Sequence, residues 1–140
     1  MSSFSPIPSY ILGTLFTLSG IISFISPSTE YKTFGFPIPS SSPSPSSTIS
    51  NSSSPPSHPQ ISPYVYAKGI RDLTYGLTFF IFQLQGQDSV ITAFTGIVCI
   101  AGFVDGVLVW TFGGGWKGKA VEHWGAVAVL GSWGLWRTVG

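Results

Sequence analysis

The chain has 140 residues, of which 44% are hydrophobic and only 8% are charged, against about 25% charged in an ordinary soluble domain. So few charges cannot build a water-facing surface, which excludes an ordinary soluble domain and indicates a lipid environment. The formal net charge of +1 excludes the basic surface that binds nucleic acid, and the single cysteine excludes a disulfide framework within one chain.

The first predicted element is an apolar helix at residues 7–25, which contains no charged side chain. At about 1.5 Å of rise per residue, a helix of this length crosses a hydrocarbon core of about 30 Å. Pro6 and Pro8 lie at its start, where missing amide donors are tolerated, and Pro27 follows its end. A cleaved signal peptide is the alternative, but the segment lacks a basic first region and an A-x-A-like cleavage site. We therefore expect a retained membrane helix.

Residues 27–63 are predicted to form a disordered loop. Prolines and serines dominate this segment, and such a composition buries too little apolar surface to offset the entropy lost on ordering. Its first part, residues 31–38, is aromatic, and we expect it to lie at the lipid headgroups. Asn51 begins an N-x-S glycosylation acceptor, which carries a glycan only if the loop is lumenal.

Three further apolar runs follow, at residues 66–84, 90–112 and 119–136. Runs of about twenty apolar residues exceed the usual strand of about three to ten residues, and they lack the alternation of a lipid-facing barrel. The sequence therefore predicts an all-α fold, a four-transmembrane-helix bundle that forms a single membrane domain over residues 1–140.

The distribution of basic residues predicts how the bundle lies in the membrane. With four spans, both termini lie on one side and the long loop on the other. Five of the six basic residues belong to the loop side, and Arg137 alone belongs to the side of the termini. Because cytosolic segments carry an excess of Lys and Arg, we expect a cytosolic loop and lumenal termini, in the endoplasmic reticulum or another endomembrane.

Five ionisable residues are predicted to lie at a similar depth within the spans. By helical rise, Arg71 and Asp72 lie roughly 8 to 9 Å inside the second span, and Asp105 roughly 10 Å from the end of the third. Glu122 and His123 lie roughly 5 to 6 Å inside the fourth span. Since three helices contribute these groups in the same leaflet, we expect them to converge on one polar pocket.

The spacing of polar residues on the second span supports this convergence. Lys68, Arg71, Asp72 and Tyr75 recur at intervals of three and four residues, so they share one stripe of the helix. We expect Arg71 and Asp72 to act in catalysis, and Lys68, Tyr75 and Glu122 to contact the ligand.

Asp105 is the most informative single residue. A carboxylate that faces hydrocarbon costs on the order of 2.5 to 3.5 kcal/mol, so it should be paired or protonated. Gly102 and Gly106 surround it with small residues, a pattern that lets a neighbouring helix approach closely. We therefore expect Asp105 to face helices and to pair with Arg71, and this pairing could be its whole role.

Structural alternatives exist for the other charged residues. Arg71 and Asp72 can mark a helix start, with Asp72 at the positive end of the helix dipole and Arg71 reaching to lipid phosphates. Glu122 and His123 can likewise begin a helix at the interface. The chain has no HExxH motif and no cysteine cluster, so we expect no metal and no cofactor.

Three motifs point to a family: AKGIRDLTYG in the second span, FVDG in the third, and VEHW at the opening of the fourth. The chain resembles a family of small fungal four-helix membrane proteins classed as a domain of unknown function. The resemblance covers nearly the whole chain outside residues 40–62. It implies a multi-pass topology in fungi, sometimes in the setting of secondary-metabolite pathways, and it brings no accepted mechanism from which a catalytic role could be transferred. The candidate positions that match are Arg71, Asp72, Asp105 and His123.

The first functional hypothesis is a membrane protein with a polar pocket for a lipophilic small molecule, acting as an accessory protein or as an isomerase or cyclase on a pathway intermediate. In that reading Arg71 holds an enolate or carboxylate, Asp105 or Asp72 acts as base, and His123 acts as acid.

The second hypothesis is an assembly protein, whose buried charges fix helix packing and which recruits a partner membrane enzyme. A small proton-coupled transporter is a weaker third, because the charged residues lie to one side of the membrane midplane. In each reading membrane lipid is a partner and nucleic acid is not.

Overall fold

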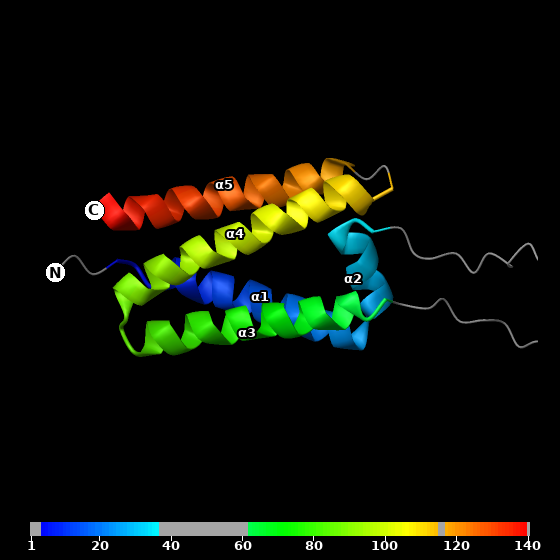
Figure 1. The fold of residues 1–140 in the computed structure, drawn as a ribbon. Helices are drawn as coiled ribbons and strands as arrows, with labels where there is room; N and C mark the ends of the chain where they lie inside the picture. The colour runs from blue at the N-terminus through cyan, green and yellow to red at the C-terminus, as the bar shows by residue number, and fades with distance from the viewer. Residues whose placement is uncertain (1–3, 37–61, 115–116, 140) are drawn as a thin grey trace, which may run out of the picture.

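The computed structural model describes residues 4–36, 62–114 and 117–139. Within these ranges the chain forms five helices and no strand, so the predicted all-α class is confirmed for this part of the chain. The helices are α1 (Ile7–Ile25), α2 (Pro27–Phe34), α3 (Tyr64–Leu84), α4 (Asp88–Phe112) and α5 (Lys117–Val139) (Figure 1). The four long helices occupy the four predicted apolar runs, with ends that differ by a few residues.

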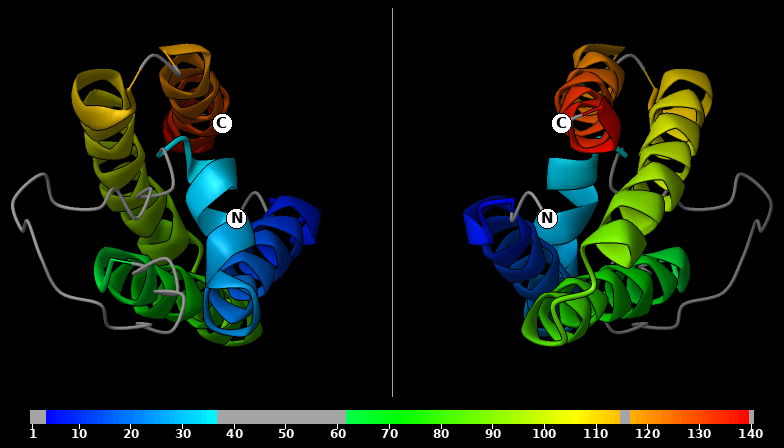
Figure 2. Two further views of the ribbon diagram at one scale, coloured as in Figure 1. Left: turned by 90° about the vertical axis from the view of Figure 1, so that its right-hand side faces the viewer. Right: turned by 90° about the vertical axis from the view of Figure 1, so that its left-hand side faces the viewer.

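The long helices form two pairs, α1 with α3 and α4 with α5. Figure 2 shows the α4–α5 pair above the α1–α3 pair, with α2 between the pairs at one end of the molecule. At the opposite end the pairs are joined by the short turn from α3 to α4, and α4 inclines away from α3 beyond that turn (Figure 1). The start of α1 and the end of α5 lie at the same end as this turn.

Glycines set the close approach of α1 and α3. A Cβ atom added at Gly20 would lie 2.7 Å from the backbone nitrogen of Leu73, and one added at Gly76 would lie 2.6 Å from the backbone nitrogen of Thr17. Only glycine fits such contacts between backbones, as in other helix pairs built on small residues. The close seam brings Ser19 of α1 within hydrogen-bond distance of side chains on α3.

Small residues also join α4 to α5. A Cβ added at Gly102 would lie 2.8 Å from the Cγ2 atom of Val127, and one added at Gly106 would meet the indole of Trp124. The Trp124 indole N–H donates to the backbone carbonyl of Phe103 across 3.3 Å. The small-residue face predicted around Asp105 therefore packs against a neighbouring helix.

Helix α2 corrects the prediction that residues 27–63 form a loop from their beginning. Pro27 occupies the first turn, where its fixed φ favours a helix, and Gly35 ends the helix at a φ of 105°. Phe34 is buried against Val109 and Ala120, so it does not lie at the lipid headgroups as expected. The average composition of a long segment concealed a helix of eight residues. Residues 37–61 of the predicted loop, with Asn51, lie outside the described residues.

Buried side chains of this protein are polar as often as they are apolar, and many large apolar side chains are exposed. Among the described residues, the buried set holds seven hydrophobic and eight polar or charged side chains. Large apolar side chains such as Ile11, Leu18, Ile100 and Phe103 are exposed instead. By length and composition, α1 and α4 are the helices that could cross a membrane among those described. These features point to association with a membrane.

Candidate functional site

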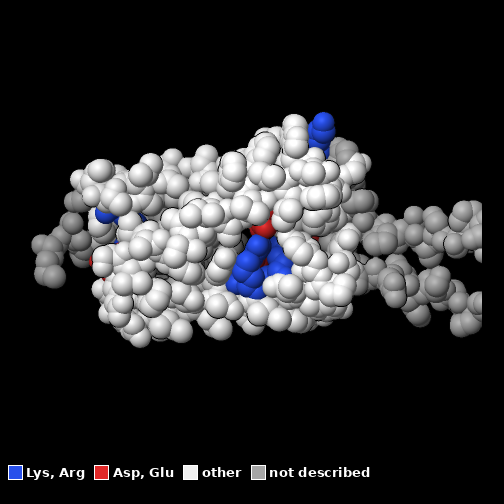
Figure 3. Space-filling view, viewed as in Figure 1, with Lys and Arg blue, Asp and Glu red and all other residues white. Residues whose placement is uncertain are grey.

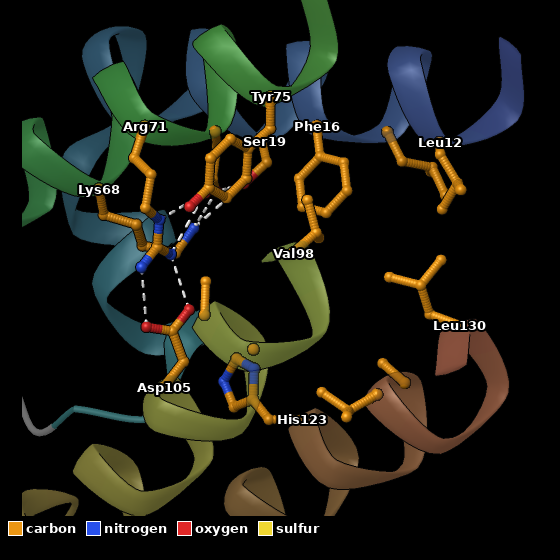
Figure 4. Close-up of a pocket in the computed structure, with 16 residues that line it drawn as sticks. Leu12, Phe16, Ser19, Lys68, Arg71, Tyr75, Val98, Asp105, His123 and Leu130 are labelled. Carbon is orange, nitrogen blue, oxygen red and sulfur yellow. Dashed lines mark hydrogen bonds and ion pairs between the residues drawn. The ribbon is translucent and has the colours of Figure 1, made fainter. Parts of the chain in front are cut away.

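A cavity of about 350 Å³ lies between the two helix pairs, and all four long helices contribute to its wall. Its polar end is formed by Ser19, Lys68, Arg71, Asp72, Asp105 and His123. Its opposite end is apolar, with side chains such as Leu12, Phe16, Val98 and Leu130 (Figure 4). The surface view shows basic and acidic atoms together in a hollow on the face between α3 and α4 (Figure 3). The cavity is thus amphipathic and reaches the flank of the molecule.

Arg71 of α3 binds Asp105 of α4 across the cavity. The Nη1 atom of Arg71 donates to Oδ1 of Asp105 over 2.9 Å, and Nη2 donates to Oδ2 over 2.6 Å. This is a bidentate pair with two parallel hydrogen bonds, the strongest form of guanidinium–carboxylate contact. The Asp105 side chain is 8% exposed and the Arg71 side chain 30% exposed. The predicted ion pair is therefore present, and Asp105 faces other helices.

Lys68 of α3 is held between two further carboxylates. Its Nζ atom lies 2.6 Å from Oε1 of Glu30 and 2.5 Å from Oδ2 of Asp72. The hydroxyl of Ser19 donates to Oδ2 of Asp72 over 2.8 Å and lies 3.2 Å from the Lys68 amine. Three helices, α1, α2 and α3, thus meet at this ammonium group.

Asp72 connects the two ion pairs into one network. Its Oδ1 atom lies 3.3 Å from Nη2 of Arg71, while its Oδ2 atom binds Lys68. The charges therefore alternate from Glu30 through Lys68, Asp72 and Arg71 to Asp105. Removing charges from water is costly, and alternation with hydrogen bonds offsets that cost. We call these five residues the ion-pair network.

Aromatic rings separate the network from the apolar end of the cavity. The Arg71 guanidinium lies 5.9 Å from the centroid of the Tyr75 ring, and the Tyr75 ring meets Phe16 edge to face at 5.8 Å. Tyr75 also meets Phe94 at 5.6 Å. A ring face beside a cation is favourable electrostatically. The predicted ligand residues Lys68 and Tyr75 both line the cavity.

His123 reaches the cavity from α5. Its Nε2 atom lies 3.3 Å from the backbone carbonyl of Phe34, and its ring lies 4.9 Å from the Phe34 ring. Since a carbonyl oxygen only accepts, the Nε2 atom is the donor in this contact, and in the tautomer with its single proton there Nδ1 is an acceptor. His123 therefore couples α2 to α5 and can offer one hydrogen-bond acceptor.

Glu122 is not brought to the cavity. Its side chain is 66% exposed and binds Lys119 over 2.7 Å, one turn earlier on α5. This exposed pair lies in the first turns of α5, away from the cavity, and it agrees for Glu122 with the alternative of a helix-start role. Of the predicted site residues, Lys68, Arg71, Asp72, Tyr75, Asp105 and His123 line the cavity.

Two members of the polar cluster were missed by sequence reasoning, Glu30 and Ser19. Glu30 falls in the segment expected to be a loop, and Ser19 is an ordinary small residue within an apolar span. The available signal for Glu30 was the pattern of Pro27 and Gly35 around it, which is typical of a short helix. No comparable signal marks Ser19.

A second polar cluster holds the opposite end of α4 and α5. The buried Arg137 side chain donates to Oδ1 of Asp88 over 2.9 Å and to Thr92 over 3.0 Å. Its guanidinium also lies 5.1 Å from the centroid of the Trp133 ring. This cluster lies outside the cavity and joins the start of α4 to the end of α5.

Among the residues that the structure describes, no three or more His, Cys, Asp or Glu side chains form a group that could hold a metal ion. A carboxylate, a guanidinium, an ammonium and an imidazole acceptor can bind a polar group and move a proton.

The fold and the site define an all-helical protein with an amphipathic cavity and a buried ion-pair network. The family model described as Domain of unknown function (DUF4267) matches residues 13–137, and the chain belongs to this family. The match includes the whole ion-pair network. It confirms the predicted membership of a family of unknown function, and the fungal setting stays a prediction. Comparison with curated proteins and with solved structures finds no match.

Proposed function

We propose that this protein is a multi-pass membrane protein whose cavity binds a lipophilic small molecule. The observation that carries the proposal is the polarity of the cavity, with the ion-pair network at one end and an apolar wall at the other. A volume of about 350 Å³ falls within the range of about 300 to 1,000 Å³ found for small-molecule sites.

The membrane part of the proposal has α1, α3, α4 and α5 as spans. Exposed apolar side chains on α1 and α4 support it, because such surfaces are stable against lipid and not against water. Lys32, Lys117 and Lys119 lie on the α2 side of the bundle, whereas Arg137 is buried against Asp88 at the other end. The positive-inside tendency then favours a cytosolic α2 side and lumenal termini in an endomembrane such as the endoplasmic reticulum.

The chemical part of the proposal is acid and base catalysis on a pathway intermediate, such as an isomerisation or cyclisation in secondary metabolism. Asp105 and His123 both line the cavity and come from neighbouring helices. Two titratable groups beside one apolar cavity are the parts that proton transfer requires. Arg71 orients Asp105 through the bidentate pair.

Ligand binding is tested by what the protein carries out of its host membrane. We expect a lipophilic molecule to co-purify with the full chain and to be lost from Ala101→Phe, which fills the cavity wall. Ala128→Phe is the matched control, because Ala128 is exposed and does not line the cavity. The measurement is mass spectrometry of organic extracts of the three purified proteins. An identical set of molecules in all three would remove the binding claim.

The catalytic part needs a separate test in the host. Deletion of the gene should change the profile of lipophilic metabolites, and Asp105→Asn should fail to restore it although the protein accumulates. If Asp105→Asn restores the profile, the catalytic part of the proposal is wrong and only the binding part remains.

One observation favours an assembly role as the second candidate. Every charged side chain of the network has an opposite charge within hydrogen-bond distance, so the network can act purely to fix helix register. In that case the protein would recruit a partner membrane enzyme. It would then co-purify with that enzyme in both Ala101→Phe and Ala128→Phe, and it would carry no small molecule.

A further inference from the structure

The ion-pair network does not balance its own charge. It contains three carboxylates, on Glu30, Asp72 and Asp105, and two cations, Lys68 and Arg71. Three negative and two positive charges leave one negative charge in excess. All of these side chains except Arg71 are less than one tenth exposed, so water neutralises the excess poorly.

Both cations are already occupied by carboxylates. Lys68 is shared between Glu30 and Asp72, and Arg71 is shared between Asp72 and Asp105. An anionic head group that approached Arg71 would therefore meet two carboxylates within a few ångströms. Like charges at such distances repel strongly in a partly buried site. Although Arg71 lines the cavity, it thus gives no affinity for a fatty acid or a phosphate.

The other groups at the polar end are hydrogen-bond acceptors and aromatic rings. Asp105 lines the cavity and has lone pairs beyond those used by Arg71, and the Nδ1 atom of His123 is not used in the contact with Phe34. Tyr75 and Phe16 form the wall next to them. Acceptors with aromatic rings are the surroundings that a protonated amine prefers.

We propose that the cavity selects a lipophilic amine, with its ammonium group beside Asp105 and its apolar body between Phe16 and Leu130. This rests on the proposed function, since it names the class of molecule that the cavity binds. The amine supplies the positive charge that the ion-pair network lacks. The two acceptors at this end, Asp105 and His123, receive the N–H donors of the amine.

A proton is the alternative source of that charge. A proton on His123 or on one carboxylate would neutralise the network without any ligand. An amine would then bind no better than a neutral alcohol of the same length.

The test uses the full chain in nanodiscs of phosphatidylcholine, a lipid without net charge. Dodecylamine, dodecanol and dodecanoic acid are the probes, because they share one chain length and differ in head group. Binding is measured by native mass spectrometry near neutral pH, and binding to Ala101→Phe is subtracted as lipid background. We expect the amine to bind at least about tenfold more tightly than the acid, with the alcohol between them, where tenfold corresponds to about 1.4 kcal/mol.

Glu30→Gln tests the charge argument away from the cavity, because Glu30 belongs to the network and does not line the wall. Loss of this carboxylate makes the network neutral, and we expect the preference for amine over acid to fall about tenfold or more. Asp105→Asn should reduce the same preference from within the cavity.

The outcomes separate the two proposals. Binding of the acid or the alcohol as tight as that of the amine overturns the amine proposal and leaves a lipophilic site. An unchanged preference in Glu30→Gln also overturns it. If none of the three probes binds the natural chain better than Ala101→Phe, the proposed function itself fails.

Discussion

The Arg71 side chain joins α3 to α4 across the cavity through its bidentate pair with Asp105. We predict that Arg71→Gln destabilises the protein by about 3 kcal/mol, since it leaves Asp105 buried without its partner. This value is the lower end of the range for buried pairs, because the Arg71 side chain is 30% exposed. The measurement is thermal unfolding of the two purified proteins in detergent micelles.

The double variant Arg71→Gln with Asp105→Asn separates pairing from other effects. Two neutral amides can bond each other, so we expect the double variant to regain most of the lost stability. A double variant no more stable than Arg71→Gln alone would mean that ion pairing is not what these residues contribute.

Part of this residue-scale picture could be predicted from the sequence. The helical rise predicts that Arg71 and Asp105 lie at a similar depth in the membrane. The free-energy cost of an unpaired carboxylate in lipid then predicts that they form an ion pair. Arg137 shows the limit of such reasoning. The count of basic residues assigns it only to the side of the termini, whereas in the structure its side chain is buried against Asp88. The position of a residue along a helix does not tell which way its side chain points around the helix axis. When the flanking residues are apolar on all sides, no amphipathic face indicates that direction.

At the scale of elements, the seam between α1 and α3 is the most constrained contact. We predict that Gly20→Ala costs about 1 to 3 kcal/mol, because the new methyl group would press on the backbone of Leu73, which cannot rotate away. Gly96→Ala is the matched control on α4, since nothing lies within 4 Å of its added Cβ. It should be neutral or stabilising by up to about 1 kcal/mol through helix propensity. Thermal unfolding of both variants provides the comparison, and equal stabilities would contradict the tight seam.

The elements also show where composition fails as a guide. The four long helices could be predicted because each is a long apolar run with its own breakers. α2 could not be predicted from hydropathy, because a helix of eight residues next to a Ser/Pro-rich segment contributes little to any average. α2 is stabilised by contacts with other helices, namely the ion pair of Glu30 with Lys68 and the burial of Phe34. Such contacts with distant residues are invisible to a local pattern.

For the whole molecule, the helix order predicts a simple topology. The start of α1 and the end of α5 lie at the same end of the bundle (Figure 1). If all four long helices span, tags fused to the two termini will be on the same side of the membrane, and we expect that side to be lumenal. Protease protection of both tags in sealed microsomes, with digestion after detergent is added, is the measurement. Opposite protection of the two tags would exclude four spans.

The hollow in Figure 3 lies on the flank between α3 and α4, and not at either end of the bundle. In the proposed orientation this flank touches acyl chains, so a guest molecule would arrive sideways out of the bilayer. The concentration that governs occupancy is then the one dissolved in the membrane, set by the partition coefficient of the guest. Among guests with one head group, longer tails would saturate the protein at lower total doses even when their intrinsic affinities are equal.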